Sequence, residues 1–430
     1  MWALLVRSLT AISNFAISMI IARLLAPDQV GAYFLLVSFV SVAVSFTLLG
    51  LDVAIVRIIA KAVAMNERGV IRQSILKSRW MSLLSSFILA LFLYFIGLEL
   101  LSVHVFKNAA IYDFRLLVAI WLVLWSLESL NAEFFRGFKR FHLAVLFKRL
   151  APNAIIVVIS GSLFLSSISI ELADYLGIVV FAWFMSVVIS SYMLQRYFLK
   201  KEESDDVATK YLLSMSMPLW FTSWIGLALP QMDLWIVSFY ESPEMVALYG
   251  AAMRLILIVA MPLLIIQSVV PPLIAESYAQ GDHKDLARGL QTASGLAFFP
   301  GFALCIVYLF AGDFILQLMY GDFYVDAYLV LRIMTIGVLF RLFAVSSQSL
   351  LTMTGHGKTT MVISIVSGLT MVFGSLYFGK LYGMKGIASM AATSLALANM
   401  LNLFFARYLT GIWVYPFVRR SEIRKVLKSK

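Results

Sequence analysis

The stretch Ala26-Pro27-Asp28-Gln29-Val30-Gly31-Ala32-Tyr33 recurs half the chain length later as Ser242-Pro243-Glu244-Met245-Val246-Ala247-Leu248-Tyr249. Each copy places a proline before an acidic residue and leads into a long apolar run. The copies stand at equivalent points of two halves, so the repeat indicates a duplication. We therefore expect two halves of similar fold. The apolar runs around the two copies indicate the class of that fold.

The composition excludes a water-soluble fold. Of 430 residues, 62% are hydrophobic and only 13% are charged, whereas a soluble domain carries about 25% charged residues. A chain with so few charges cannot cover its surface with polar groups, so that surface must face the lipid bilayer. In a membrane protein, Lys and Arg collect in cytoplasmic loops. We therefore attribute the formal net charge of +11 to such loops rather than to binding of a nucleic acid.

We expect about twelve transmembrane helices, since a span needs about 20 apolar residues. The first begins the chain, and we interpret it as a retained helix because Arg7, Ser13 and Asn14 interrupt its apolar core. The expected spans are 1–25, 33–56, 80–101, 116–132, 150–168, 172–195, 211–239, 247–272, 291–311, 326–351, 360–378 and 387–406.

The basic residues of the connections predict the orientation. With a cytoplasmic N-terminus, 25 Lys or Arg fall in inside segments and four fall in outside loops, at Lys107, Arg115, Lys380 and Lys385. Cytoplasmic loops are enriched in Lys and Arg. Both termini are therefore predicted to be cytoplasmic.

The expected fold class is all-α integral membrane, with two six-helix lobes and a central cavity. Because six is an even number, the two lobes keep one orientation and form a parallel repeat. We expect an N-lobe at 1–200, a C-lobe at 201–410 and a basic cytoplasmic tail at 411–430.

The motifs predict neither an enzyme nor a cofactor site. Cys305 stands alone, and the four histidines do not pair at a spacing of three or four residues. Gly355-His356-Gly357-Lys358-Thr359 ends like a phosphate-binding loop but lacks the upstream glycine. No connection is long enough to form a catalytic domain.

Several stretches, in the right order along most of the chain, resemble one family. They are residues 22–33, 136–141, 233–255, 321–333 and 382–388. The chain resembles the polysaccharide-exporter branch of the MOP superfamily, the Wzx-type flippases of lipid-linked oligosaccharides. It departs from that pattern before the last stretch, where Gly379 and Lys380 replace the usual proline.

Polar residues inside the spans are the candidates for a transport pathway. Asn14 and Ser18 each lie within about 20° of Arg7 around a helix. An arginine inside a span needs a partner or water, so this stripe should face the bundle interior. A second stripe joins Asp52 to three serines of span 2, namely Ser38, Ser41 and Ser45.

Further candidates come from one helix face and from the resemblance. Trp125 and Glu128 share a face of span 4 with Trp121. The resemblance implies that Asp233 and Arg254 line the lumen in the C-lobe. The alternative for all these polar residues is that they pair between helices and only hold the bundle together.

The resemblance implies a flippase in the cytoplasmic (inner) membrane. Its substrate would be a polyprenyl-diphosphate-linked glycan for O-antigen, capsule or exopolysaccharide assembly, moved by alternating access. Arginine binds phosphate oxygens through charge-assisted hydrogen bonds, which suits that substrate. An H⁺ or Na⁺ gradient is a candidate energy source, and a polysaccharide polymerase and a chain-length regulator are candidate partners.

Two alternatives remain open. A multidrug or cation antiporter of the related MATE branch needs an acidic lumen, and Asp52, Glu128 and Asp233 keep that alternative open. A membrane glycan polymerase or glycosyltransferase is less favoured, because it needs a large extramembrane loop.

Overall fold

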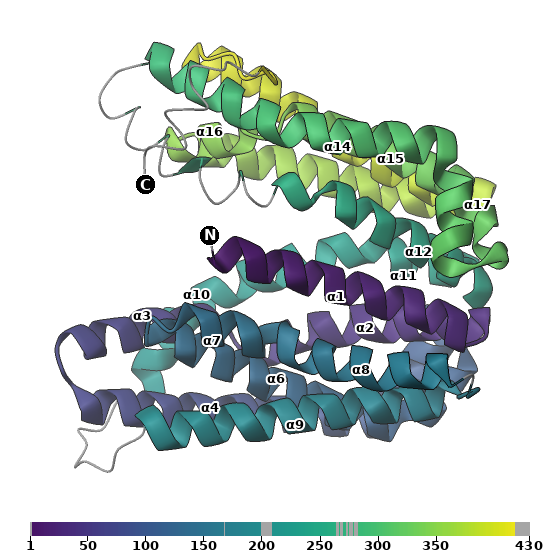
Figure 1. Ribbon diagram of the computed structural model, residues 1–430. Coiled ribbons are helices and arrows are strands. Elements are labelled where there is room, and N and C mark those ends of the chain that lie inside the picture. Colours follow the sequence, from purple (N-terminus) through teal and green to yellow (C-terminus); the bar gives the residue numbers. More distant parts are fainter. Residues whose placement is uncertain are drawn as a thin grey trace. The chain divides into compact units, whose positions relative to one another are not determined.

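The computed structural model describes residues 2–166, 168–198, 209–263, 266, 270–271, 274, 278 and 283–417. Within these ranges all regular structure is helical (Figure 1). The internal contacts of the chain divide it into two units, unit 1 at Met1–Ala247 and unit 2 at Leu248–Lys430.

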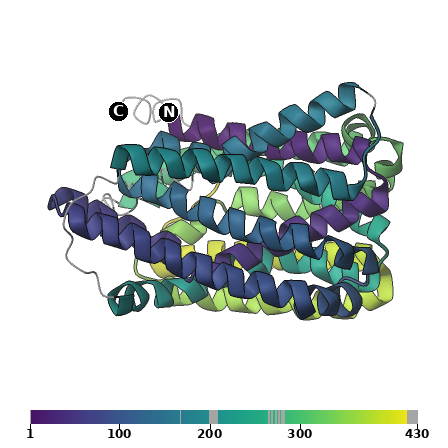
Figure 2. The ribbon, with the colours of Figure 1, turned by 90° about the horizontal axis from the view of Figure 1, so that it is seen from below.

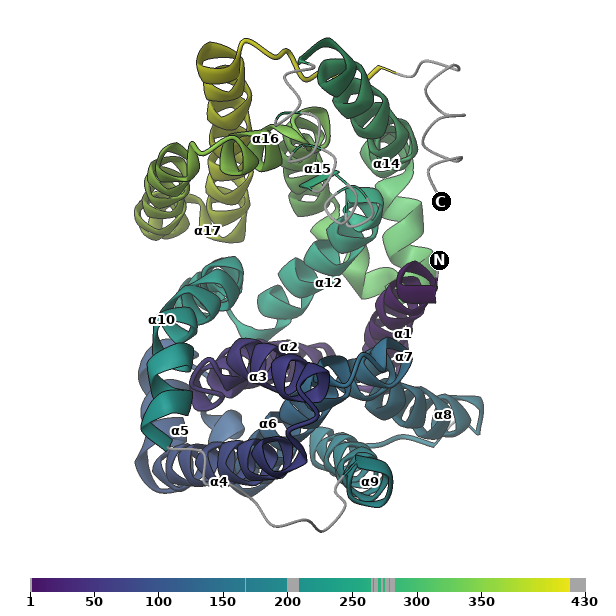
Figure 3. The same ribbon diagram turned by 90° about the vertical axis from the view of Figure 1, so that its left-hand side faces the viewer.

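Unit 1 is built around helix α6. This helix, Arg115–Gly137, contacts α2, α3, α4 and α9, and Figure 3 shows α4 and α9 beside it. Figure 2 shows the long helices of this unit running lengthwise, roughly parallel or antiparallel. The elements are α1 Trp2–Leu24, α2 Pro27–Thr47, α3 Leu51–Ala64, α4 Arg68–Phe92, η1 Leu93–Gly97, α5 Leu98–Leu100, η2 Leu101–Val105, η3 Ala109–Phe114, α6, α7 Phe141–Val145, η4 Leu146–Leu150, α8 Ala151–Leu165, α9 Leu172–Phe198, α10 Thr209–Ala228, η5 Leu229–Gln231 and α11 Met232–Tyr240.

Unit 2 begins at Leu248, within helix α12 (Pro243–Val259), which starts in the second copy of the repeat. Helix α15 (Tyr328–Phe343) packs between α14 (His283–Tyr320) and α17 (Gly357–Thr410). The short elements are η6 Asp322–Ala327 and α16 Ser347–Met353.

The lengths and apolar faces of these helices make the chain a multi-pass integral membrane protein. Eight described stretches are long and apolar enough to cross a bilayer. One of them, α17, is a pair of spans, and α1, α6 and α12 stand at three further expected spans. Large side chains such as Leu165 and Phe310 are more than 80% exposed, which is expected of groups that face lipid. The expected all-helical class with about twelve spans in two lobes is confirmed.

Helix α17 is a hairpin. A straight helix of its 54 residues would measure about 80 Å, far more than the roughly 30 Å apolar thickness of a bilayer. Gly383 breaks it with φ 59° and ψ −144°, values that favour glycine. The two halves pack together, since Ser394 Oγ donates a hydrogen bond to the Ser367 carbonyl at 2.7 Å.

The expected span 33–56 is wrong in one respect, because it is interrupted. Helix α2 ends at Thr47, and Leu49 and Gly50 take left-handed φ values of 52° and 74° before α3 begins at Leu51. A Cβ on Gly50 would lie 2.2 Å from the Ser216 carbonyl oxygen, so only glycine allows α10 to approach here. Asp52 therefore lies on a separate helix from Ser38.

The contact division falls after span 7, whereas the repeat puts the lobe boundary before it. Helices α10 and α11 contact α2, and Trp235 Nε1 of α11 donates a hydrogen bond to Ser38 Oγ at 2.8 Å. The six-span lobe boundaries at 200 and 410 stay a prediction.

Candidate functional site

A polar cavity lies inside unit 1, between α1, α2, α6, η4, α8 and α9. Its volume is about 50 Å³, room for one or two water molecules at roughly 30 Å³ each. A larger ligand would therefore require these helices to move apart. The cavity is lined by Asn14, Ile17, Tyr33, Val37, Trp121, Trp125, Arg149, Asn153, Ile156, Val179 and Trp183.

Arg149 is the one charged residue among these described lining residues. It lies on η4, a turn of π-helix, a local widening that is frequent at functional sites. Its guanidinium carbon stands 5.0 Å from the centre of the Trp125 ring, so the ring face stabilises the positive charge. This contact leaves the N–H groups of Arg149 available as donors to a ligand.

Three tryptophans form the aromatic wall of the cavity. Trp121 stacks on Trp125 with ring centres 5.7 Å apart, and Trp125 stacks on Trp183 at 4.9 Å. Tyr33 extends the series, 6.5 Å from Trp121 and nearly parallel to it. Among the described residues the buried Nε1 of Trp121 has no hydrogen-bond partner, so it is a further donor in the cavity wall.

Two asparagines supply the amide groups. Asn153 Nδ2 donates to Ser13 Oγ at 3.1 Å and to Asn14 Oδ1 at 3.0 Å. These bonds join α8 to α1 and fix the amide of Asn153, which is only 6% exposed. The cavity thus combines a guanidinium, two amides and aromatic faces, and no carboxylate is among its described lining residues.

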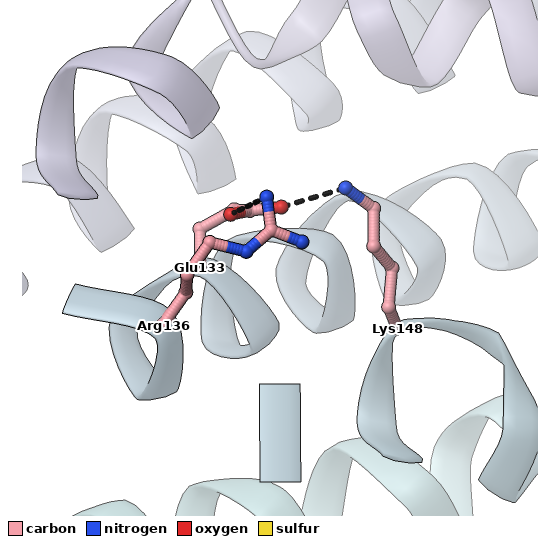
Figure 4. A network of polar contacts seen from close by, with 3 residues as sticks. All are labelled: Glu133, Arg136 and Lys148. Carbon is pink, nitrogen blue, oxygen red and sulfur yellow. Dashed lines mark hydrogen bonds and ion pairs between the residues drawn. The ribbon is translucent and has the colours of Figure 1, made fainter. Parts of the chain in front are cut away.

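A charged cluster adjoins the cavity through η4. Lys148, next to Arg149, donates to Glu133 Oε1 at 2.6 Å, and Arg136 Nη1 lies 3.0 Å from Glu133 Oε2 (Figure 4). The Glu133 side chain is 3% exposed. Asp52 lies within electrostatic range of Lys148 and Glu133, so this expected site residue belongs to the charged cluster and not to the cavity lining.

Glu128 is not among the described residues that line the cavity and lies in a network between helices. It is fully buried and accepts hydrogen bonds from Ser186 and, at 2.5 Å, from Ser190 of α9. Asn131 donates to Ser190 at 2.9 Å and accepts from Arg79 of α4 at 2.7 Å. These contacts favour the bundle-holding interpretation for Glu128.

The other expected residues are dispersed. Of the span 1 stripe, Asn14 lines the cavity, Ser18 is buried with its hydroxyl bonded to the Phe15 carbonyl, and the side chain of Arg7 lies outside the described residues. In unit 1, Asp233 is 8% exposed near the start of α11. In unit 2, Arg254 Nη1 donates to the Gly250 carbonyl at 2.9 Å.

Sequence reasoning placed Trp125 and Asn14 in the site but missed Arg149 and Asn153. Arg149 is one of the 25 basic residues that the charge pattern assigns to the inside segments. A helical signal was present, because residues 149, 153 and 156 follow the i, i+4, i+7 spacing of one helix face. The approach of this face to the tryptophans is a tertiary contact with no local signal.

Comparison with known proteins identifies the family of this chain. A family profile described as polysaccharide biosynthesis protein matches residues 1–278, and a second, MatE, matches residues 218–377. The chain belongs to the polysaccharide biosynthesis protein family. The expected family is confirmed. No curated protein matches the chain.

Solved structures with the same fold are membrane transporters. An inward-facing MATE family multidrug transporter is 14% identical with a TM-score of 0.76, and the match covers 94% of each chain. The lipid II flippase MurJ in an inward closed conformation is 14% identical with a TM-score of 0.73, covering 94% of this chain and 87% of MurJ. A third, from Pyrococcus furiosus, is a MOP superfamily transporter for which the reverse polarity of the binding pocket suggests a different function; it is 14% identical with a TM-score of 0.62, covering 95% and 94%.

Proposed function

We propose that the protein is a flippase that carries a polyprenyl-diphosphate-linked oligosaccharide across the cytoplasmic membrane by alternating access. The family supports a role in polysaccharide synthesis. The observation that carries the proposal is the positive charge of the cavity. Arg149 is the one charged residue among its described lining residues, and its guanidinium lies over the ring of Trp125. Arginine recognises phosphate through its planar fork, and aromatic faces and amides suit sugar rings.

The proposal includes an orientation and an energy source. Both termini lie in the cytoplasm, as the positive-inside rule predicts. An H⁺ or Na⁺ gradient drives transport, and the chain acts as a carrier and not as an enzyme. A polymerase and a chain-length regulator receive the exported glycan.

The competing function is that of a cation antiporter. It would place a carboxylate in the binding cavity, and the MatE match over residues 218–377 keeps the buried Asp233 a candidate. The contacts of the other two acidic residues do not favour a cation site in the cavity. Glu128 accepts hydrogen bonds from two serines of α9, and Asp52 lies near Lys148. For the Pyrococcus furiosus relative, a reversed pocket polarity already suggests a different function within the superfamily.

The test is glycan export in a deletion strain complemented with single variants. Arg149→Ala should reduce export at least about tenfold, since a charge-assisted bond contributes about 1.5–3 kcal/mol. Arg149→Lys should recover part of it, because it restores the charge without the fork. The control is Arg196→Ala, which also removes an arginine beside an aromatic ring, Tyr192, but outside the cavity.

Membrane abundance of each variant is measured alongside export. Arg7 and Arg254, expected lumen residues, should show the same charge order as Arg149. Wild-type export by normally abundant Arg149→Ala protein, together with loss in Asp52→Ala or Asp233→Ala, would replace the flippase by the antiporter.

A further inference from the structure

The segment after α17 folds back as a strap across unit 2. Helix α17 ends before Gly411, which has a left-handed φ of 70°. The strap, residues 411–417, is fixed to Gln291 of α14: Gln291 Nε2 donates to the Trp413 carbonyl at 3.0 Å, and the Phe417 amide donates to the Gln291 carbonyl at 3.2 Å. Ile412 and Val414 are buried, whereas Trp413 stays 45% exposed.

A groove of about 390 Å³ lies between this strap and the last turns of α17. Met400, Leu403, Phe404, Arg407, Trp413 and Val414 line it. Apart from Arg407 the lining side chains are apolar or aromatic. The groove is therefore an apolar groove that could hold a hydrocarbon chain, with the guanidinium of Arg407 as the one cationic group among its described lining residues.

Arg407 is held at the groove by its aromatic neighbour. Its guanidinium carbon stands 3.8 Å from the centre of the Trp413 ring, close enough for a strong cation–π contact. That contact leaves the five N–H donors of arginine for an anion, and their fork matches the oxygens of a phosphate. Tryptophan, like tyrosine, is also enriched at the headgroup level of a membrane.

The charge of the neighbouring sequence has the same sign. Beyond Phe417 the chain carries six further Lys or Arg residues and one Glu. Basic residues next to a membrane span attract the anionic lipids of the cytoplasmic leaflet. A groove that presents apolar walls and an arginine at this point combines the two features that a charged lipid recognises.

We propose that this groove binds one anionic glycerophospholipid of the cytoplasmic leaflet. An acyl chain lies along Leu403 and Phe404, and the lipid phosphate is bound by Arg407. The site rests on the cytoplasmic placement of the C-terminus proposed above. The lipid fastens the strap to α17, so it stabilises unit 2.

The experiment is native mass spectrometry of the purified full-length protein with added phosphatidylglycerol or phosphatidylethanolamine. Wild-type protein should retain phosphatidylglycerol preferentially. Arg407→Gln should bind it about fivefold more weakly, the loss expected for one basic residue at a membrane surface, and Leu403→Trp, which fills the groove, should weaken it too. The control is Arg332→Gln, which removes an arginine stacked on Tyr328 and should leave lipid retention unchanged.

A third arm adds a polyprenyl phosphate in competition with phosphatidylglycerol. Equal retention of the two phospholipids by wild-type protein, or equal loss in Arg407→Gln and Arg332→Gln, would overturn the proposal. Displacement of phosphatidylglycerol by substoichiometric polyprenyl phosphate would assign the groove to the transported lipid instead. These readouts do not involve glycan export, so they stand apart from the test of Arg149.

Discussion

The carbonyl oxygen of Pro243 occupies the space that a side chain on Gly31 would need. A Cβ atom at Gly31 would lie 1.9 Å from that oxygen and 3.2 Å from the Ala247 backbone nitrogen. In the second repeat copy Pro243 corresponds to Pro27 and Ala247 to Gly31. The two copies therefore pack backbone to backbone at their equivalent positions, each starting a helix at its proline, where proline is favoured.

Replacing Gly31 by alanine should destabilise the protein. The clash is with backbone, which cannot rotate away, and overpacking of this kind costs about 1–3 kcal/mol or more. Thermal denaturation in detergent and abundance in the membrane measure the effect. The control is Gly161→Ala in α8, where a Cβ meets nothing within 4 Å. Equal melting temperatures for the two variants would show that the α2 contact is not tight.

Replacing Glu128 by glutamine should leave export and abundance close to wild type. Glutamine keeps one oxygen as an acceptor for one of the two serines, Ser186 and Ser190, and its amide N–H can donate to the other hydroxyl. Glu128→Leu should lower stability because it leaves those hydroxyls and Asn131 with fewer partners. Export in the complemented strain and blotting of membranes give both quantities. Loss of export in normally abundant Glu128→Gln protein would instead make Glu128 a proton carrier.

Reversing the charge of either Glu133 or Lys148 alone should lower the membrane abundance of the protein, and exchanging the two charges should restore part of it. Glu133→Lys leaves Lys148 and Arg136 facing a third cation, and Lys148→Glu adds an acid beside Glu133 and Asp52. Each single variant should lose most of its membrane abundance, and the double variant should recover part of it. The same exchange at the exposed pair Asp285 and Arg288 should change stability by less than about 1 kcal/mol. A double variant no better than the singles would refute the pairing.

Cysteine labelling separates the two described residues of the span 1 stripe. With Cys305 replaced by Ala, cysteine at Asn14 should react with a water-soluble thiol reagent, because Asn14 is exposed and lines the polar cavity. Cysteine at Ser18 should react far more slowly, since Ser18 is 1% exposed. Fast labelling at Ser18 would show that α1 turns a different face to water.

A topology reporter that works only outside the cytoplasm tests the orientation. Fusions at Pro27, Ser169 and Ser242 should give signal, and fusions at Arg68, Arg140 and the C-terminus should be silent, because basic loops are retained inside. The reverse pattern would invert the orientation and remove the basis for an inner-leaflet lipid at Arg407.

The sequence by itself determined the class of fold. Lipid cannot hydrogen-bond the backbone, so long apolar runs had to become helices, and the duplicated segment around Pro27 and Pro243 pointed to two related halves. The family followed from ordered motifs along most of the chain, and Asn14 and Trp125 were found because a helix face has a fixed spacing.

Only the tertiary structure decided which polar residues share a site. The break at Gly50 separates Asp52 from the serines of α2, and the approach of α9 draws Glu128 into bonds with Ser186 and Ser190. Arg149, which looked like one more cytoplasmic charge, turns inward because η4 places it over Trp125. Periodicity fixes which residues share a helix face, whereas the partner of that face depends on packing between distant helices, for which a single sequence carries no local signal.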